Sequence, residues 1–279
     1  MRERFSAVIP YWPLVLGFTL LALPTIATLA KESWVREIGA HGPIVLATGA
    51  WLLVAQRQRG MEREGPLWGV ALLAVPAFML YAFGRAYDFI SVETAGLYGV
   101  MLAIALRLIG FRAMAANWFP FLYLAFVIPP PGWVIDKITA PLRTFVSYVV
   151  TEGLQLLDYP ITRDGVTMTV AQYSLLVEDA CSGMNSLIGL SAVSLLYIYL
   201  MHRASWRYAL LLVAFVLPVA VIANIVRVTA LVLLTYYAGD AVAQGFLHVT
   251  TGMVLFMFAL GLIFLIDAVL QRLFMRGRA

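Results

Sequence analysis

Long apolar stretches constrain this chain more than any other feature of its sequence. A helix needs about 20 mostly apolar residues to cross the hydrocarbon core of a membrane, and eight segments approach or reach that length. The sequence therefore predicts an all-α polytopic membrane protein. No internal repeat or linker separates the segments, so residues 1–279 are expected to form a single integral membrane domain. The predicted spans are residues 11–30, 41–56, 66–84, 92–110, 115–130, 182–201, 208–237 and 248–270.

The composition excludes several classes of protein. Only 12% of the residues are charged and 62% are hydrophobic, whereas about 25% of the residues in a soluble domain are charged. A soluble globular domain and a disordered chain are therefore excluded. The basic residues stand in short groups between the apolar spans, so no nucleic-acid partner is expected. Because the chain has no HExxH, CxxC, GxGxxG or Walker-type motif, the sequence predicts no metal and no cofactor.

Basic residues indicate which side of the membrane each loop faces, because cytoplasmic loops are enriched in Lys and Arg. If the N-terminus is cytoplasmic, most arginines fall on the cytoplasmic side and most loop carboxylates on the opposite side. Both termini are therefore predicted to be cytoplasmic, with membrane lipid around the spans. The basic residues assigned to the cytoplasm are Arg2, Arg4, Arg57, Arg59, Arg63, Arg107, Arg112, Arg203, Arg207, Arg272, Arg276 and Arg278, and those assigned to the outside are Lys31, Arg36, Arg85, Lys137, Arg143 and Arg163.

The long loop at residues 131–181 is predicted to lie on the extracytoplasmic side. Its first part has apolar residues at helical spacing with charged residues between them. The apolar residues are Ile135, Ile138, Leu142, Phe145, Val149 and Leu156. This pattern predicts an amphipathic helix that lies on the outer leaflet. Farther along, Asp164-Gly165 stands between alternating β-branched residues and predicts a short β-hairpin.

Cys181 is the single cysteine of the chain, which excludes an intramolecular disulfide. It stands at the outer end of the sixth predicted span, and a helix N-terminus stabilises a thiolate through its dipole and its free N–H groups. Two interpretations stay open: a reactive nucleophile, or a small apolar residue packed against a neighbouring helix. In the first interpretation, the adjoining Ser182 and Gly183 are expected to help position a substrate.

Arg227 lies within the seventh predicted span, before its outer end. An arginine at membrane depth costs about 2.5–3.5 kcal/mol even on insertion-based scales. It must therefore face a polar interior, an anion or water, or else extend along the span to the interface. Asn224 lies three residues earlier on the same helix face, which favours an interior site in which Asn224 helps to position a substrate.

His248 opens the eighth predicted span, again at its outer end, and taken alone it is typical of an interfacial histidine. The short connections between the last three spans predict that these spans are neighbours, so His248 is expected near Cys181 and Arg227. A thiol, an imidazole and a fixed positive charge are the groups that thiol acyl transfer needs. In this hypothesis Cys181 attacks a carbonyl, His248 transfers the proton, and Arg227 stabilises the oxyanion or orients the carbonyl.

These residues resemble the exosortase/archaeosortase family. The resemblance rests on Val177-Glu178-Asp179-Ala180-Cys181-Ser182-Gly183, on Asn224-Ile225-Val226-Arg227-Val228, and on His248 followed by Gly252. It is strongest between residues 165 and 270, whereas the N-terminal half matches only in hydropathy. Archaeal relatives commonly have arginine at the third position, so His248 favours the bacterial exosortase branch.

The resemblance implies a membrane-embedded cysteine protease and transpeptidase with Cys181, Arg227 and His248 as its catalytic residues. The implied partners are exported proteins that end in a sorting signal, namely a Pro-Glu-Pro type motif, a transmembrane helix and basic residues. The family cleaves near the motif in step with surface polysaccharide export, so a polysaccharide or lipid-linked acceptor is a further candidate partner. The implied location is the inner membrane of a Gram-negative cell, with the active site on the extracytoplasmic side.

The residues themselves leave other function classes open. A transporter or flippase for lipid-linked sugars is disfavoured, because the spans contain one deep basic residue and no repeat symmetry. A membrane acyltransferase would use the same Cys181 on a lipid or thioester substrate. A non-catalytic assembly protein for extracellular polysaccharide would not need Cys181 at all.

Overall fold

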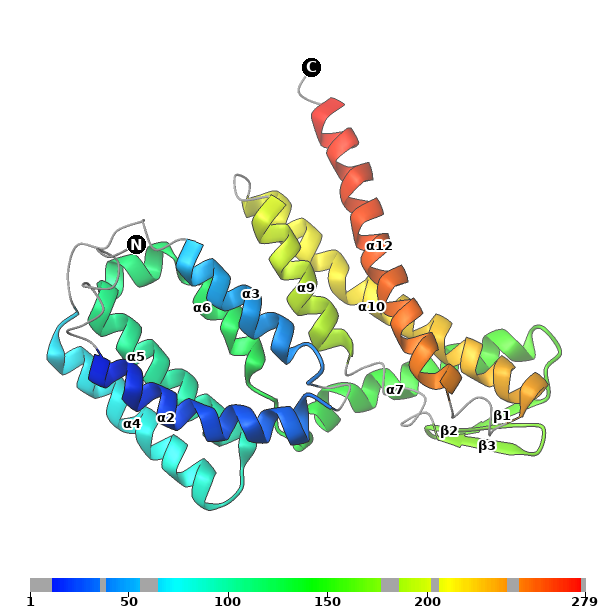
Figure 1. Ribbon diagram of the computed structural model, residues 1–279. Helices are drawn as coiled ribbons and strands as arrows, with labels where there is room; N and C mark the ends of the chain where they lie inside the picture. The colour runs from blue at the N-terminus through cyan, green and yellow to red at the C-terminus, as the bar shows by residue number, and fades with distance from the viewer. Residues whose placement is uncertain are drawn as a thin grey trace. The chain divides into compact units, whose positions relative to one another are not determined.

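The computed structural model describes residues 12–35, 39–55, 65–176, 186–201, 206–239 and 246–276, and most of them are helical (Figure 1). The chain divides into two compact units, Met1–Pro131 and Gly132–Ala279. The predicted organisation as a single membrane domain stays a prediction.

The described part of the first unit consists of helices joined by turns and short irregular segments. Two of its helices continue into a short helical turn of another type, π-helical after the first and 3₁₀ after the last. The elements are α2 (Trp12–Thr28) with η2 (Leu29–Ser33), α3 (Gly42–Ala55), α4 (Leu67–Ala86), α5 (Ile90–Ala116), and α6 (Trp118–Leu124) with η3 (Ala125–Val127).

Helices α4 and α5 approach each other closely, and a buried carboxylate joins them to α2. A Cβ atom added to Gly96 would lie 2.3 Å from the backbone nitrogen of Tyr81, so the approach requires glycine. Glu93 is buried and accepts hydrogen bonds from Thr25 Oγ1 at 2.6 Å and from Arg85 Nη1 at 3.2 Å. These contacts stabilise the arrangement of three helices within the first unit.

The fifth predicted span, residues 115–130, is not one continuous helix in the structure, and its crossing of the membrane stays a prediction. Helix α5 is interrupted at Gly110, where φ is 74° and ψ is 165°, and a second break at Asn117 separates it from α6. Together α6 and η3 cover Trp118–Val127, about 15 Å of helix, which is half of the roughly 30 Å core of a bilayer. The Pro129-Pro130-Pro131 run follows and disfavours any continuation of the helix.

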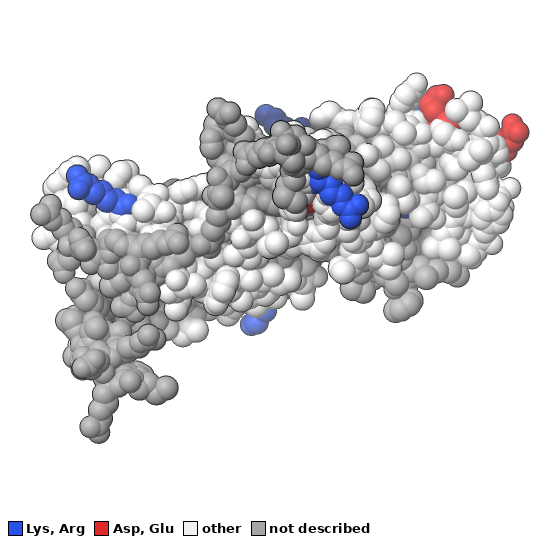
Figure 2. All heavy atoms as spheres, turned by 90° about the horizontal axis from the view of Figure 1, so that it is seen from above, with Lys and Arg blue, Asp and Glu red and all other residues white. Residues whose placement is uncertain are grey.

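Four described helices are long and apolar enough to cross a membrane, or five if Trp118–Val127 and Gly132–Gln155 together make one broken span. The four are Trp12–Ser33, Leu67–Ala86, Ile90–Ala116 and Tyr208–Ala238. The predicted total of eight crossings stays a prediction. In Figure 2 charged side chains are sparse among the described atoms of the face in view, as expected for a surface in contact with lipid.

The second unit combines helices with a small antiparallel sheet of order β1-β2-β3. The predicted amphipathic helix at the start of the long loop is confirmed as α7. The elements are α7 (Gly132–Gln155), β1 (Ile161–Asp164), β2 (Thr167–Val170), β3 (Tyr173–Leu176), α9 (Ser186–Met201), α10 (Trp206–Ala238) and α12 (Phe246–Arg276).

Strands β1 and β2 meet at the turn that the sequence marked. Asp164 pairs with Thr167, so the two loop residues are Gly165 and Val166 rather than Asp164 and Gly165. Gly165 has a φ of +59°, a conformation that glycine adopts without steric cost. Strand β3 extends the hairpin to three strands, which the sequence did not predict.

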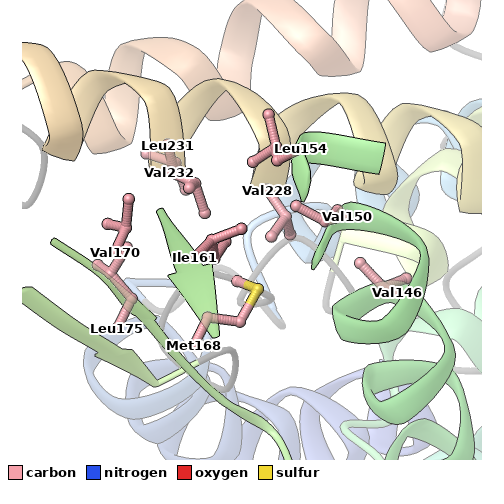
Figure 3. Close-up of a cluster of buried hydrophobic side chains, with 10 residues drawn as sticks. All are labelled: Val146, Val150, Leu154, Ile161, Met168, Val170, Leu175, Val228, Leu231 and Val232. Atoms are coloured by element: carbon pink, nitrogen blue, oxygen red, sulfur yellow. The ribbon is translucent and has the colours of Figure 1, made fainter. Parts of the chain in front are cut away.

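Two apolar clusters hold the second unit together, and both include α10. The loop core joins α7, the sheet and α10 (Figure 3); the bundle core joins α9, α10 and α12. The buried residues of the loop core are Val146, Val150, Leu154, Ile161, Met168, Val170, Leu175, Val228, Leu231 and Val232. Those of the bundle core are Leu190, Val216, Val219, Ala220, Ala223, Ala259 and Ile263.

Candidate functional site

Arg227 and Asn224 form a polar level on α10 between the two apolar cores. Ala223 is the last residue that α10 contributes to the bundle core, and Val228 is the first that it contributes to the loop core. Arg227 is 3% exposed and Asn224 is 5% exposed. An arginine that extends along a lipid-facing surface stays accessible, so the burial of Arg227 assigns it to the protein interior.

Helices α9, α10 and α12 contact one another and share two layers along their length. One layer is polar, because Tyr197 of α9 and Tyr208 of α10 both donate hydrogen bonds to Asp267 of α12. The other layer is the bundle core. Two shared layers define the relative direction of the three helices.

The layers place particular parts of the three helices at the same end of the bundle. In α9 and α12 the bundle core lies on the N-terminal side of the polar layer. In α10 it lies on the C-terminal side of that layer. Arg227 lies in that half of α10, and His248 lies in the first turn of α12. Cys181 precedes α9 in the sequence. The starts of α9 and α12 therefore lie on the same side of the bundle core as Arg227 on α10.

Several predicted site residues fall outside the described part of the chain. Cys181, Ser182 and Gly183 lie in residues 177–185, and for His248 only the helical backbone is described. The distances among the sulfur of Cys181, the imidazole of His248 and the guanidinium of Arg227 thus stay predictions. Helix α9 is described from Ser186 onward, within the predicted span 182–201.

The long loop packs onto α10 immediately beyond Arg227. Val228 belongs to the loop core together with residues of α7 and the sheet. At the end of α10, Tyr237 Oη lies 2.8 Å from Tyr159 Oη, and the ring of Tyr159 stands edge-on to that of Tyr236. The last strand of the sheet, β3, leads towards Cys181 in the sequence. The loop therefore packs on the part of α10 that follows Arg227.

The sequence matches the model of one protein family, described as transmembrane exosortase (Exosortase_EpsH), over residues 34–265. The chain belongs to the transmembrane exosortase family. The match covers most of the chain and includes the positions of Cys181, Arg227 and His248. No curated protein and no solved structure gave a significant match. Membership confirms the predicted resemblance and, with the apolar helices, identifies this exosortase as a membrane protein.

Sequence reasoning missed two buried carboxylates of this exosortase. Glu93 and Asp267 each lie inside a predicted span, are 3% and 2% exposed, and accept hydrogen bonds from neighbouring helices. An acidic residue within an apolar span is a signal in itself, because its burial in a membrane is costly unless it is paired. Hydropathy averaged over a span hides such a residue.

Proposed function

We propose that this exosortase is a cysteine peptidase and transpeptidase that cleaves the C-terminal sorting signals of exported proteins through a thioacyl intermediate. The observation that supports this most is the burial of Arg227 on α10, at the bundle end to which the starts of α9 and α12 lead. Family membership adds an independent reason. Cys181, Arg227 and His248 are the catalytic residues of this proposal, and Asn224, Ser182 and Gly183 help to position the substrate.

The reaction proceeds in two half-reactions. The Cys181 thiol loses its proton to the His248 imidazole, and the sulfur attacks the carbonyl carbon of the scissile peptide bond. As the C–N bond breaks, the imidazolium returns the proton to the leaving amine, and an acyl-enzyme thioester remains. Water or an acceptor nucleophile then displaces the sulfur. Arg227 donates hydrogen bonds to the oxyanion or orients the substrate carbonyl.

The substrate of this proposal is itself a membrane protein before cleavage. Its motif of the Pro-Glu-Pro type precedes a transmembrane helix, which moves laterally in the lipid until it lies against the helices of the site. The active site then lies on the extracytoplasmic side of a Gram-negative inner membrane, with both termini of the enzyme in the cytoplasm. A polysaccharide or lipid-linked acceptor is the candidate for the second half-reaction, which links the enzyme to surface polysaccharide export.

The long loop is proposed to cover the site and to recognise the motif. Support comes from the loop core, which seats α7 and the sheet on α10 directly after Arg227. Exchange of residues 131–181 for the loop of a relative with another substrate should transfer that relative's substrate preference. If preference remains with the helices after the exchange, the loop has no part in recognition.

Co-expression of the enzyme with a tailed substrate tests the proposal. The intact enzyme should release the substrate's C-terminal segment, and acid quenching should trap a thioester whose mass places the acyl group on Cys181. Because the chain has one cysteine, a thioester can form at that position alone. Cys181→Ala should insert normally and abolish both products. Processing that survives Cys181→Ala contradicts the proposal and favours a non-catalytic assembly role.

A further inference from the structure

A buried carboxylate cluster joins the three helices of the proposed site at the end away from Arg227. Asp267 on α12 is 2% exposed. Tyr197 Oη of α9 donates to Asp267 Oδ2 at 2.5 Å, and Tyr208 Oη of α10 donates to Asp267 Oδ1 at 2.6 Å. Gln271 Nε2, one turn farther along α12, donates to Oδ2 at 3.2 Å. Both carboxylate oxygens thus accept hydrogen bonds, each from a phenol on a different helix.

Stability alone gives no reason for such a cluster in an apolar bundle. A buried ionic group loses its hydration, and well-packed apolar side chains of similar volume are often as stabilising. A hydrogen bond nevertheless requires a particular distance and angle, whereas apolar contacts tolerate sliding of one helix along another. The hydrogen-bonded group of Asp267, Tyr197 and Tyr208, here called the Asp267 cluster, therefore restricts the axial position of α9 and α10 relative to α12 more than the bundle core does.

We propose that Asp267 is a positioning residue that, through Tyr197 and Tyr208, sets the relative axial positions of α9, α10 and α12. This inference rests on the proposed function, because these helices lead to Cys181, Arg227 and His248 at the opposite end of the bundle core. A shift of one helix against the others moves one of the three reacting groups away from the other two. The carboxylate itself does not touch the substrate.

The rate at which Cys181 is alkylated, measured against pH in native membranes, reports the site without any need for substrate. A thiolate beside Arg227 and a protonated His248 is stabilised, so the intact enzyme should react with a midpoint below the value of about 8.5 that is typical of a free thiol. Tyr197→Phe, Tyr208→Phe and Asp267→Asn should each raise the midpoint by about one unit, which slows alkylation about tenfold at a pH well below both midpoints. The same variants should lower kcat strongly and change KM little.

Two matched substitutions control for the chemical changes themselves. Tyr87→Phe and Asp158→Asn alter exposed side chains, and Asn tolerates the positive φ of 61° at residue 158. Both should leave the alkylation midpoint and the kinetics unchanged. If they move the midpoint as far as the Asp267 cluster variants do, the effect is not specific and the inference is overturned.

An apolar triple variant separates positioning from stability. Asp267→Leu combined with Tyr197→Phe and Tyr208→Phe removes the carboxylate together with both phenol hydroxyls, and the partly exposed Gln271 amide loses one acceptor. Thermal unfolding in detergent should therefore stay close to that of the intact enzyme. Cleavage and the alkylation midpoint should nevertheless remain impaired.

Two results contradict the inference in different ways. If the triple variant recovers full cleavage, or if every cluster variant keeps the low midpoint of the intact enzyme, the cluster has no positioning role and the proposed function is untouched. If the intact enzyme itself shows the midpoint of an ordinary thiol, the proposed catalytic site is wrong and the positioning role is overturned with it.

Discussion

At the scale of single residues, Arg227 combines a full positive charge with almost complete burial on an apolar helix. From its membrane depth the sequence left two places for this arginine, the interior or the interface, and Asn224 favoured the interior. Its 3% exposure agrees with an interior position. The sequence could not predict what surrounds the side chain, because the contacts of a helix face depend on which helices pack against it. Asp267 was missed for the same reason: its partners Tyr197 and Tyr208 lie on two other helices.

Arg227→Lys tests what the guanidinium does. Lysine keeps the charge but lacks the planar set of donors that can hold a carbonyl or an oxyanion in a fixed direction. Cleavage by Arg227→Lys should fall about 10²-fold, the usual consequence of losing an oxyanion donor, while Cys181 remains reactive. The exposed Arg112 supplies the matched control, because Arg112→Lys should cleave at the original rate. Near-normal cleavage by Arg227→Lys would reduce the role of Arg227 to its charge.

At the scale of elements, local patterns predicted α7 and the hairpin turn, but not the third strand or the broken fifth span. Apolar residues at helical spacing were sufficient to predict α7 as a helix, but the residues that it buries in the loop core are Val146, Val150 and Leu154. The predicted Ile138, Phe145 and Leu156 are exposed. Strand β3 forms by pairing with the edge of β2, and such pairing is not visible in the local sequence pattern of β3. The fifth span is interrupted at Asn117 and followed by three prolines, and hydropathy counts apolar residues but not such helix breaks.

Met168→Ala tests whether the loop core seats the long loop on α10. Met168 is fully buried in that core, and truncation of a buried methionine to alanine typically costs about 2–5 kcal/mol. Limited proteolysis in detergent should therefore cut residues 131–176 faster in Met168→Ala than in the intact protein. The neighbouring Thr169 is exposed on the other face of β2, so Thr169→Ala should be cut at the original rate. Equal rates for both variants would contradict the packing of the loop on α10.

Gly96→Ala tests the close approach of α4 and α5 in the first unit. The added methyl would lie 2.3 Å from the backbone nitrogen of Tyr81, so the helices must separate, at a cost of about 1–3 kcal/mol. Thermal unfolding in detergent should begin at a lower temperature. Gly17→Ala is the matched control, because nothing lies within 4 Å of a Cβ at that position of α2 and alanine favours helix. If both variants unfold alike, α4 and α5 do not pack as described.

At the scale of the whole molecule, the sequence predicted membership of the exosortase family from three short elements, and the family match over residues 34–265 confirms it. Those elements were informative because reacting groups must keep their identity, whereas apolar spans can exchange one hydrophobic residue for another. The number of crossings was harder to predict. Hydropathy alone does not distinguish a crossing helix from a short apolar helix such as α3, whose 14 residues are fewer than the roughly 20 that a crossing needs.

The predicted sidedness can be measured with Cys181 itself. The uneven distribution of arginines predicts that Cys181 lies on the extracytoplasmic side. In intact inner membranes, a membrane-impermeant maleimide added from that side should label Cys181. In a Cys181→Ala background, a cysteine introduced by Arg112→Cys should react only after the membrane is disrupted. The reverse labelling pattern would invert the predicted topology.

The convergence of Cys181, Arg227 and His248 is measured most directly by chemical cross-linking in native membranes. His248→Cys and Arg227→Cys each add one thiol to a chain that has a single native cysteine, and a short bifunctional methanethiosulfonate should join it to Cys181. Val254→Cys places a thiol at an exposed position of the same helix as His248 and should not be joined. Efficient linkage at residues 248 and 227 but not at 254 is the predicted result. Linkage at neither position, or equal linkage at 254, would contradict a shared catalytic site.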